Sequence, residues 1–160
     1  MASAAVNGLA AARALRLARA MISQKTRYAF RALFYLARSK GPVSLASIAA
    51  NEKISRKFLE LVMVELKRHR LVVSSRGKKG GYELARPANE ISYAGVRVMD
   101  GPLAMVPCAS VTAHRQCRAC YDPDFCAIRS VLMEVRQGTA EILERHTLSD
   151  FLGILPKITV

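Results

Sequence analysis

Apolar positions recur at the three- and four-residue spacing of amphipathic helices in the first half of the chain. Two segments with this spacing, 25–39 and 56–70, flank a short apolar segment, 45–52. Ser44 and Ser55 directly precede the second and the third of these segments in chain order. Because a serine hydroxyl can accept a hydrogen bond from a free amide at a helix start, we expect both serines to be N-caps. The pattern therefore predicts three consecutive helices.

The next segment, 71–84, contains two short β-prone runs on either side of the glycine-rich sequence RGKKGG. Such runs around a glycine-rich turn are typical of a β-hairpin. Gly77, Gly80 and Gly81 suit the tight turn and the close backbone approach that a hairpin tip requires. The order helix, short helix, helix and basic-tipped hairpin is that of a winged helix-turn-helix. We therefore expect a mainly α fold with a small β element (α+β).

The second half of the chain contains a short predicted helix and a long one. Ser92 is expected to cap a helix over 93–100, which ends at a Gly-Pro pair. An irregular loop follows. Asp122 and Pro123 then form the N-cap and first-turn pairing of a helix start, and the helix is expected to run to about Arg145.

The long predicted helix carries an apolar stripe at helical spacing. Its members are Ile128, Val131, Leu132, Val135 and Ile142. We expect no second long helix in the chain that would cover this stripe. Pairing with the same helix of another subunit is therefore the economical arrangement.

Charge is distributed unevenly, within a formal net charge of +13. Residues 21–90 contain 15 Lys and Arg against 5 Asp and Glu, whereas residues 91–160 contain 7 of each kind. The basic excess thus belongs to the part that predicts the winged helix-turn-helix. A basic module beside a neutral one indicates a surface for a polyanion, although a basic surface that only keeps the protein soluble would also account for the charge.

The first 20 residues are rich in alanine, lack acidic residues and contain three arginines. They are consistent with a mitochondrial-type transit peptide, an amphipathic tail or an upstream extension of the reading frame. The sequence from Met21 onward reads as the start of a complete domain. We expect this extension to be disordered or marginally helical. Arginines interrupt its apolar residues, so no secretory signal is predicted, and no apolar run approaches the ~20 residues that span a bilayer. These features predict a soluble, cytoplasmic protein without a membrane partner.

In a helix-turn-helix the second helix enters the major groove, and its N-terminal residues meet base edges. Lys and Arg can donate to guanine, Glu can accept from cytosine, and a basic hairpin tip can reach phosphates. The predicted DNA-binding residues are Ser55, Arg56, Lys57, Phe58 and Glu60 on the helix and Arg76, Lys78 and Lys79 on the hairpin. The predicted domains are an N-terminal extension (1–20), a winged helix-turn-helix DNA-binding domain (21–90), and a cysteine-loop sensor region with a dimerisation helix (91–160).

The cysteines cluster near the start of the long predicted helix, at the spacing C-x8-C-x2-C-x5-C. They are Cys108, Cys117, Cys120 and Cys126. Clustering argues against incidental packing residues. Disulfides in a reducing cytosol would be transient and regulatory, four thiolates suit tetrahedral zinc, and iron–sulfur clusters are also held by thiolates. The spacing alone leaves these three alternatives open.

Three stretches of the chain read SQKTRYAFRALFYLA, VSLASIAANEKISRKFLELVMVELKRHRLVVSSRGKKGGYELARP and EISYAGVRVMDGPLAMVPC. They resemble the IscR/NsrR/RirA family of bacterial winged-helix transcription regulators, over about residues 22–152. The resemblance implies a cytoplasmic, nucleoid-associated homodimer that is held by the long C-terminal helix and binds a partly palindromic operator in double-stranded DNA. It also implies that Lys57, Phe58, Glu60 and Arg76 lie at the DNA face.

Family members that carry a cluster have three cysteines in this loop, and these match Cys108, Cys120 and Cys126. The resemblance implies a 2Fe–2S or 4Fe–4S cluster that controls DNA affinity, with Cys117 as a fourth ligand, a resolving thiol or a bystander. We predict a transcriptional regulator, acting as a repressor, and not an enzyme, because no companion acid or oxyanion loop accompanies His114. The alternative is a regulator without a cluster that uses thiol oxidation or zinc.

Overall fold

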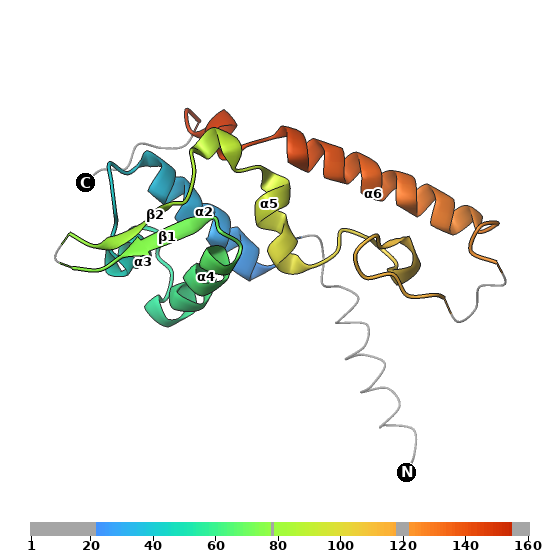
Figure 1. Ribbon diagram of the computed structural model, residues 1–160, viewed down its shortest axis with the longest axis horizontal. Helices are drawn as coiled ribbons and strands as arrows, with labels where there is room; N and C mark the ends of the chain where they lie inside the picture. Colours follow the sequence, from blue (N-terminus) through green and yellow to red (C-terminus); the bar gives the residue numbers. More distant parts are fainter. Residues whose placement is uncertain (1–21, 78, 118–121, 155–160) are drawn as a thin grey trace, which may run out of the picture.

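The computed structural model describes residues 22–77, 79–117 and 122–154. Figure 1 shows a body of short helices with a two-stranded hairpin, and one long helix that extends beyond this body. The predicted mainly α fold with a small β element is confirmed. The predicted N-terminal extension, 1–20, lies outside the described residues.

Three helices form in the first half of the chain, as predicted. They are α2 (Gln24–Arg38), α3 (Leu45–Asn51) and α4 (Arg56–Arg68). Both predicted serine caps are confirmed. Ser44 Oγ accepts from the amide of Ser47 at 3.1 Å, and Ser55 Oγ accepts from the amide of Phe58 at 3.3 Å. Because these caps satisfy amides that a helix leaves free, α3 and α4 begin at defined residues.

The three helices enclose a core of mainly aliphatic side chains, since the chain has no tryptophan and few other aromatic residues. The helix α4 contributes Leu59, Val62, Met63 and Leu66, and all four are fully buried. Burying one such side chain contributes about 1.5–3 kcal/mol. This stripe therefore fixes α4 in the body, and the opposite face of the helix remains free for solvent or a ligand.

The predicted hairpin is confirmed as two antiparallel strands, β1 (Val72–Ser75) and β2 (Gly81–Leu84). Val43, which lies between α2 and α3, exchanges two backbone hydrogen bonds of 2.8 Å with Tyr82. A Cβ on Gly81 would lie 2.5 Å from the carbonyl oxygen of Val43. Glycine at this position therefore allows the close backbone approach that anchors the hairpin to the helices.

The segment after the hairpin returns to the same core. The helix α5 (Tyr93–Arg97) is capped by Ser92, as predicted, whose Oγ accepts from the third amide ahead at 3.2 Å. Ile91, Val96 and Leu148 belong to one buried cluster with residues of α2 and α4. The short 3₁₀ helices are η1 (Ala88–Glu90), η2 (Val98–Asp100), η3 (Pro107–Ala109) and η4 (Leu148–Phe151). The core thus continues beyond residue 90.

The long helix α6 (Ala127–Arg145) begins later than predicted. Asp122 does not cap it, because its Oδ1 accepts a hydrogen bond at 2.9 Å from the amide of Asp124, two residues ahead. An aspartate with this bond closes a local turn, so the Asp-Pro pair forms a turn before the helix. Cys126 occupies the N-cap position without a capping hydrogen bond. The predicted helix end at about Arg145 is confirmed.

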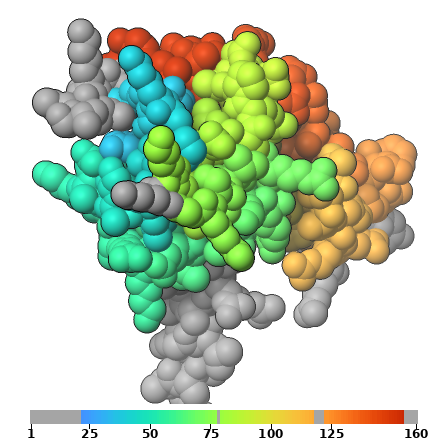
Figure 2. All heavy atoms as spheres, turned by 60° about the vertical axis from the view of Figure 1, so that its left-hand side comes forward, coloured from blue at the N-terminus to red at the C-terminus, as the bar shows by residue number. Residues whose placement is uncertain are grey.

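The chain between α5 and α6 runs beside α6 and away from the hairpin (Figure 1). Figure 2 shows these residues, in gold and orange, as a projection at the side of the body. Within the ranges that the structure covers, no helix combines the length and the apolar character needed to cross a membrane.

Candidate nucleic-acid interface and cysteine segment

The first turns of α4 present polar side chains to solvent. Ser55, Arg56, Lys57 and Glu60 are all exposed. Arg56 and Glu60 form an ion pair, with 3.5 Å between Nε and Oε1 and side chains that are 70% and 52% exposed. Exposed helix pairs of this kind contribute only about 0.3–0.5 kcal/mol. A DNA ligand could therefore separate the pair at little cost, which leaves each side chain free to meet a base.

Phe58 differs from the other predicted DNA-binding residues of α4, because its ring packs against the core. It meets the ring of Tyr28 in α2 edge-on, with 5.6 Å between the ring centroids. Aromatic pairs of this geometry contribute about 0.5–1.5 kcal/mol beyond their burial. Phe58 therefore holds the first turns of α4 against α2.

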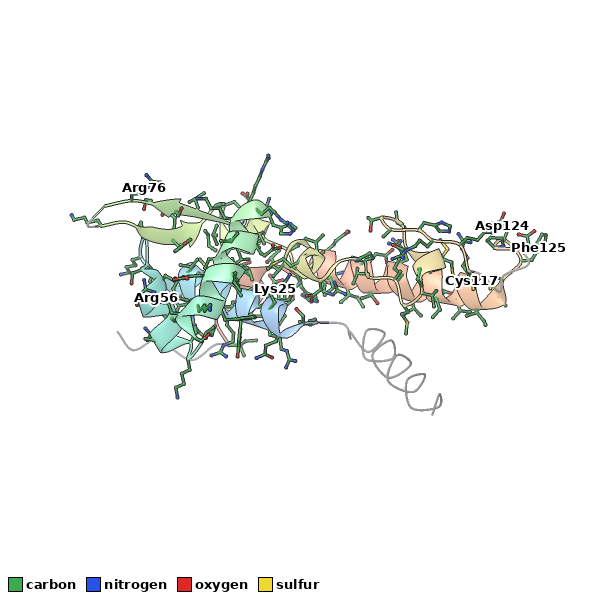
Figure 3. The ribbon with its side chains drawn as sticks, turned by 90° about the horizontal axis from the view of Figure 1, so that it is seen from below. Lys25, Arg56, Arg76, Cys117, Asp124 and Phe125 are labelled. Atoms are coloured by element: carbon green, nitrogen blue, oxygen red, sulfur yellow. The ribbon has the colours of Figure 1, made fainter. Side chains whose placement is uncertain are left out.

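The hairpin tip carries exposed cations on a glycine turn. Arg76 and Lys79 are exposed, and Lys78 lies outside the described residues. Gly77 has a φ of +107°, a left-handed conformation that favours glycine. Figure 3 shows Arg76 and Arg56 toward one end of the molecule, opposite the end that carries Cys117.

A side-chain hydrogen bond joins the hairpin to α4. Lys67 Nζ donates to Ser74 Oγ of β1 at 2.9 Å. No sequence pattern pointed to this bond, since it depends on how the hairpin packs against the helix. It holds the hairpin and α4 together as one surface.

The cysteine segment, which we define as residues 103–126, contains thiols in different environments. Cys108 in η3 and Cys126 before α6 are half-buried, whereas Cys117 is exposed, and all three are free thiols. His114 is exposed, and Cys120 lies outside the described residues. Among the residues that the structure describes, no three His, Cys, Asp or Glu side chains lie close enough together to hold a metal ion. The described thiols are thus unpaired and are not gathered into one ligand set.

The cysteine segment is tied to the first turn of α6 by Arg129. Its Nε donates to the carbonyl oxygen of Cys108 at 3.1 Å, and its Nη1 lies 4.0 Å from Asp124 Oδ1. These contacts join an early and a late part of the segment to the same side chain. Both parts of the segment therefore contact the first turn of α6.

A second set of contacts joins the residues before the cysteine segment to α2 and α4. Asp100 accepts from the amide and the hydroxyl of Ser23, at 2.8 Å and 2.5 Å, and Ser23 caps α2. Lys25 Nζ donates to the carbonyl oxygen of Met99 at 3.1 Å and lies 4.0 Å from Glu65 of α4. The pairs with Asp100 and Met99 are separated by 77 and 74 positions, so no local pattern could reveal them.

The carboxyl group of Asp100 is held in its ionised form. Burial acts to raise the pKa of Asp100, but the hydrogen bonds from Ser23 and the charge of Arg97 oppose this effect, and the pKa is lowered from its ordinary value of 3.8. Arg97 is 7% exposed, and its Nη1 donates to the carbonyl oxygen of Gly101 at 3.1 Å. The turn after η2 is thus fixed by two charged side chains.

A cavity of about 260 Å³ lies between α5, the chain after it and α6. Its lining includes Arg97, Ser110, Arg136 and Glu144. Protein interiors are normally close-packed, so this contact is incompletely filled.

The apolar stripe of α6 is exposed to solvent. Ile128, Val131, Val135 and Ile142 are 71%, 58%, 46% and 54% exposed, and none of the described α6 residues is buried. Exposed apolar surface is typical of sites that bind another protein, a ligand or a membrane. The stripe that the sequence pattern predicted is therefore available to a partner.

Comparisons with known proteins agree on one family. Residues 22–153 match the family model Rrf2, described as iron-dependent transcriptional regulators. The rrf2-like HTH-type transcriptional regulator of Rhodobacter capsulatus is 37% identical over 139 residues, which cover 83% of this chain and 93% of that protein.

Two solved structures share the fold. CymR, the global cysteine regulator of Bacillus subtilis, covers 84% of this chain and 98% of its own, with 30% identity and a TM-score of 0.67. IscR of T. potens covers 83% of this chain and 86% of its own, with 31% identity and a TM-score of 0.64. The predicted resemblance to IscR-type regulators and the predicted winged helix-turn-helix are thus confirmed. The chain belongs to the Rrf2 family of helix-turn-helix transcriptional regulators.

Proposed function

We propose that this protein is a DNA-binding transcriptional repressor whose operator affinity depends on an iron–sulfur cluster held by the cysteine segment. The observation that carries the proposal is the arrangement of two unlike regions in one chain. Arg56 at the exposed start of α4 and Arg76 of the basic hairpin lie toward one end, and the free thiol of Cys117 lies toward the other (Figure 3). Asp100, just before the cysteine segment, accepts hydrogen bonds from Ser23 at the start of α2, and Arg129 of α6 donates to Cys108. This arrangement suits a sensor, and we assign the protein no catalytic role.

In the proposed complex α4 enters the major groove, where Arg56, Lys57 and Glu60 reach base edges. The cations donate to guanine, and the glutamate accepts from cytosine. Ser55 keeps the helix start in place, and the cations of the hairpin tip contact phosphates. The exposure of these side chains and the 15 basic against 5 acidic residues in 21–90 support this arrangement.

Two copies of the chain pair through the exposed stripe of α6. A two-fold pair presents two recognition helices, so it binds a partly palindromic operator in double-stranded DNA. Half-sites one helical turn apart lie about 34 Å from centre to centre. Such a repressor acts in the bacterial cytoplasm, at the nucleoid.

The proposed cluster ligands are Cys108, Cys120 and Cys126, with Cys117 as a fourth ligand or a resolving thiol. Iron–sulfur clusters are held by thiolates, and the described members of this set are free thiols within one segment. When bound, a 2Fe–2S or 4Fe–4S cluster supplies an oxidation-sensitive crosslink between the two ends of that segment. The iron-dependent description of the family and the similarity to IscR support this assignment.

The chain's own contacts provide the coupling between the cysteine segment and the DNA-binding face. Arg129 joins Cys108 to α6, and Asp100 joins the preceding turn to Ser23 at the start of α2. Two residues further along the chain, in the first turn of α2, Lys25 Nζ lies 4.0 Å from Glu65 of α4. By linkage, if a change in the state of the segment alters the affinity for DNA by some factor, DNA binding alters the equilibrium between those states by the same factor.

A regulator without a cluster is the second candidate. The observation that favours it is Cys117, which is exposed and additional to the three cysteines of the proposed ligand set. CymR of Staphylococcus aureus, 26% identical with a TM-score of 0.62, has been solved in an oxidised form. In this candidate two thiols lose two electrons and two protons to an oxidant and form a reversible disulfide, or the thiols hold zinc.

Anaerobic purification, followed by visible absorption and by iron, sulfide and zinc analysis, separates the two candidates. The cluster proposal expects a coloured wild type with iron and sulfide, and loss of both in Cys108→Ser. The matched variant Cys117→Ser keeps them if Cys117 is a resolving thiol and loses them if it is a ligand. A wild type that stays colourless and iron-free after reconstitution contradicts the cluster, and a disulfide found by peptide mapping under oxidant then supports the alternative.

A further inference from the structure

Two apolar side chains stand on the outward face of α4. Leu61 is 60% exposed and Val64 is 64% exposed, although leucine and valine usually lie in the core. The buried stripe of α4 uses other positions of the helix, so neither side chain holds the helix in place. Residues three apart are neighbours on a helix surface. Leu61 and Val64 therefore form one exposed apolar pair.

The surroundings of this pair on α4 are charged. Lys57 precedes Leu61 by one helical turn, Arg68 follows Val64 by one turn, and both cations are exposed. Glu60 and Glu65 also lie one turn from the pair, and both form ion pairs with arginines of α4. The pair therefore lies among charged side chains, with a cation at each end. An anion that also offers small apolar groups would match the exposed cations and the apolar pair of this face.

The DNA major groove has this chemistry, since it combines flanking phosphates with one apolar group on its base edges, the C5-methyl of thymine. We propose that Leu61 and Val64 contact thymine methyl groups and thereby select thymine at defined operator positions. This inference rests on the proposed function, in which α4 enters the major groove. It adds a rule of sequence selection that the polar residues at the start of α4 do not supply.

The spacing along α4 sets where these thymines lie. Leu61 and Val64 are about 4.5 Å apart along the helix axis, which is close to the ~3.4 Å between successive base pairs. Lys57 lies about 6 Å before Leu61 on the same axis. The selected thymines are therefore expected in adjacent or next-nearest base pairs, about two and about three base pairs from the base that Lys57 contacts.

The test uses the full chain and an operator selected from a random DNA pool by the wild-type protein. Each thymine of that operator is replaced in turn by uracil, which pairs in the same way but lacks the methyl group. Dissociation constants are measured by fluorescence anisotropy at one fixed salt concentration. Loss of one buried methyl group predicts about fourfold weaker binding at one or two positions per half-site.

The protein variants assign each position to a side chain. Leu61→Ala is expected to bind the unmodified operator more weakly and to lose the uracil effect at one position. Val64→Ala is also expected to bind more weakly and to lose the uracil effect at the neighbouring position. The matched control is Val111→Ala, which removes a side chain that is 67% exposed in the cysteine segment. This control is expected to keep the full uracil effect at every position. The circular dichroism spectra of all three variants are expected to match the spectrum of the wild type.

The outcomes separate the inference from the proposed function. If the pool yields an operator but no uracil replacement weakens binding, the inference is wrong while DNA binding stands. An equal uracil effect in the wild type and in both α4 variants also overturns the inference, because other residues would then read the methyl groups. If no DNA is enriched from the pool, the proposed DNA binding fails and the inference fails with it.

Discussion

The carboxylate of Asp100 joins the start of α2 to the chain that leads into the cysteine segment. It accepts two hydrogen bonds from Ser23, and its pKa is lowered from the ordinary value of 3.8. A carboxyl group whose folded-state pKa is lowered stabilises the folded state above its ordinary pKa. That contribution is lost as the pH falls through the lowered pKa.

Asp100→Asn is expected to lower the free energy of unfolding at pH 7 by about 1–2 kcal/mol, since a charge-assisted hydrogen bond to Ser23 is replaced by a neutral one. The difference from the wild type should stay constant down to about pH 4 and shrink below it. Urea unfolding at a series of pH values measures this difference in the free energy of unfolding. Asp124→Asn, at a side chain 89% exposed, is the control and should show no such difference. A difference for Asp100→Asn that is unchanged at pH 2 would contradict the account.

Gly81→Ala is expected to destabilise the protein by about 1–3 kcal/mol, because the added Cβ would overlap the backbone of Val43. The control is Gly95→Ala in α5, where the nearest atom to a new Cβ is Ser92 Oγ at 3.6 Å. This control should be neutral or more stable, since alanine favours a helix over glycine. Thermal unfolding compares the two, and equal midpoints would show that Val43 does not constrain the hairpin.

Single residues were predictable where their role is local. Ser44, Ser55 and Ser92 cap the helices that follow them, because a cap is decided within four residues of chain. The bond between Ser23 and Asp100 depends on the packing of elements far apart in sequence. Candidate DNA-binding residues on α4 were also predictable from their position at a helix start, whereas the exposed pair of Leu61 and Val64 required the burial pattern of the folded helix.

At the scale of elements, α6 shows how a turn can displace a predicted helix boundary. The apolar spacing correctly indicated a long helix that ends near Arg145. The Asp-Pro pair satisfies the rules for a helix start, but the same aspartate can close a turn with the amide two residues ahead. Asp122 does so, and α6 begins after it. The exposed stripe that results is the surface that we propose for dimerisation.

Val135→Glu is expected to convert a dimer into a monomer, because a carboxylate at the centre of the stripe cannot be desolvated without a partner. Light scattering after size-exclusion chromatography measures the mass in solution. Ser130→Glu, which adds the same charge at an exposed position of α6 outside the stripe, is expected to remain dimeric. A wild type that is monomeric at micromolar concentration, or a dimeric Val135→Glu, would contradict pairing through this stripe.

At the scale of the whole molecule, the regions that we propose for sensing and for DNA binding lie toward opposite ends, as the positions of Cys117, Arg56 and Arg76 in Figure 3 show. The 19 residues of α6 span about 28 Å, so the cysteine segment lies far from the hairpin tip. The charge pattern predicted a basic and a neutral region. It could not predict the shared core, in which Ile91, Val96 and Leu148 join residues of α2 and α4. Because of this core, the elements directly before and after the cysteine segment and α6 pack against α2 and α4.

The most direct test of this account is the operator affinity of one protein preparation in two states of its cysteine segment. Fluorescence anisotropy under anaerobic conditions would compare the wild type after cluster reconstitution with the same protein after cluster removal, and Cys108→Ser after both treatments. A coupling of about 1–3 kcal/mol predicts dissociation constants that differ about 5- to 150-fold in the wild type. The variant should show equal constants. Equal constants in a wild type with measured iron and sulfide would contradict control of DNA binding by the cysteine segment.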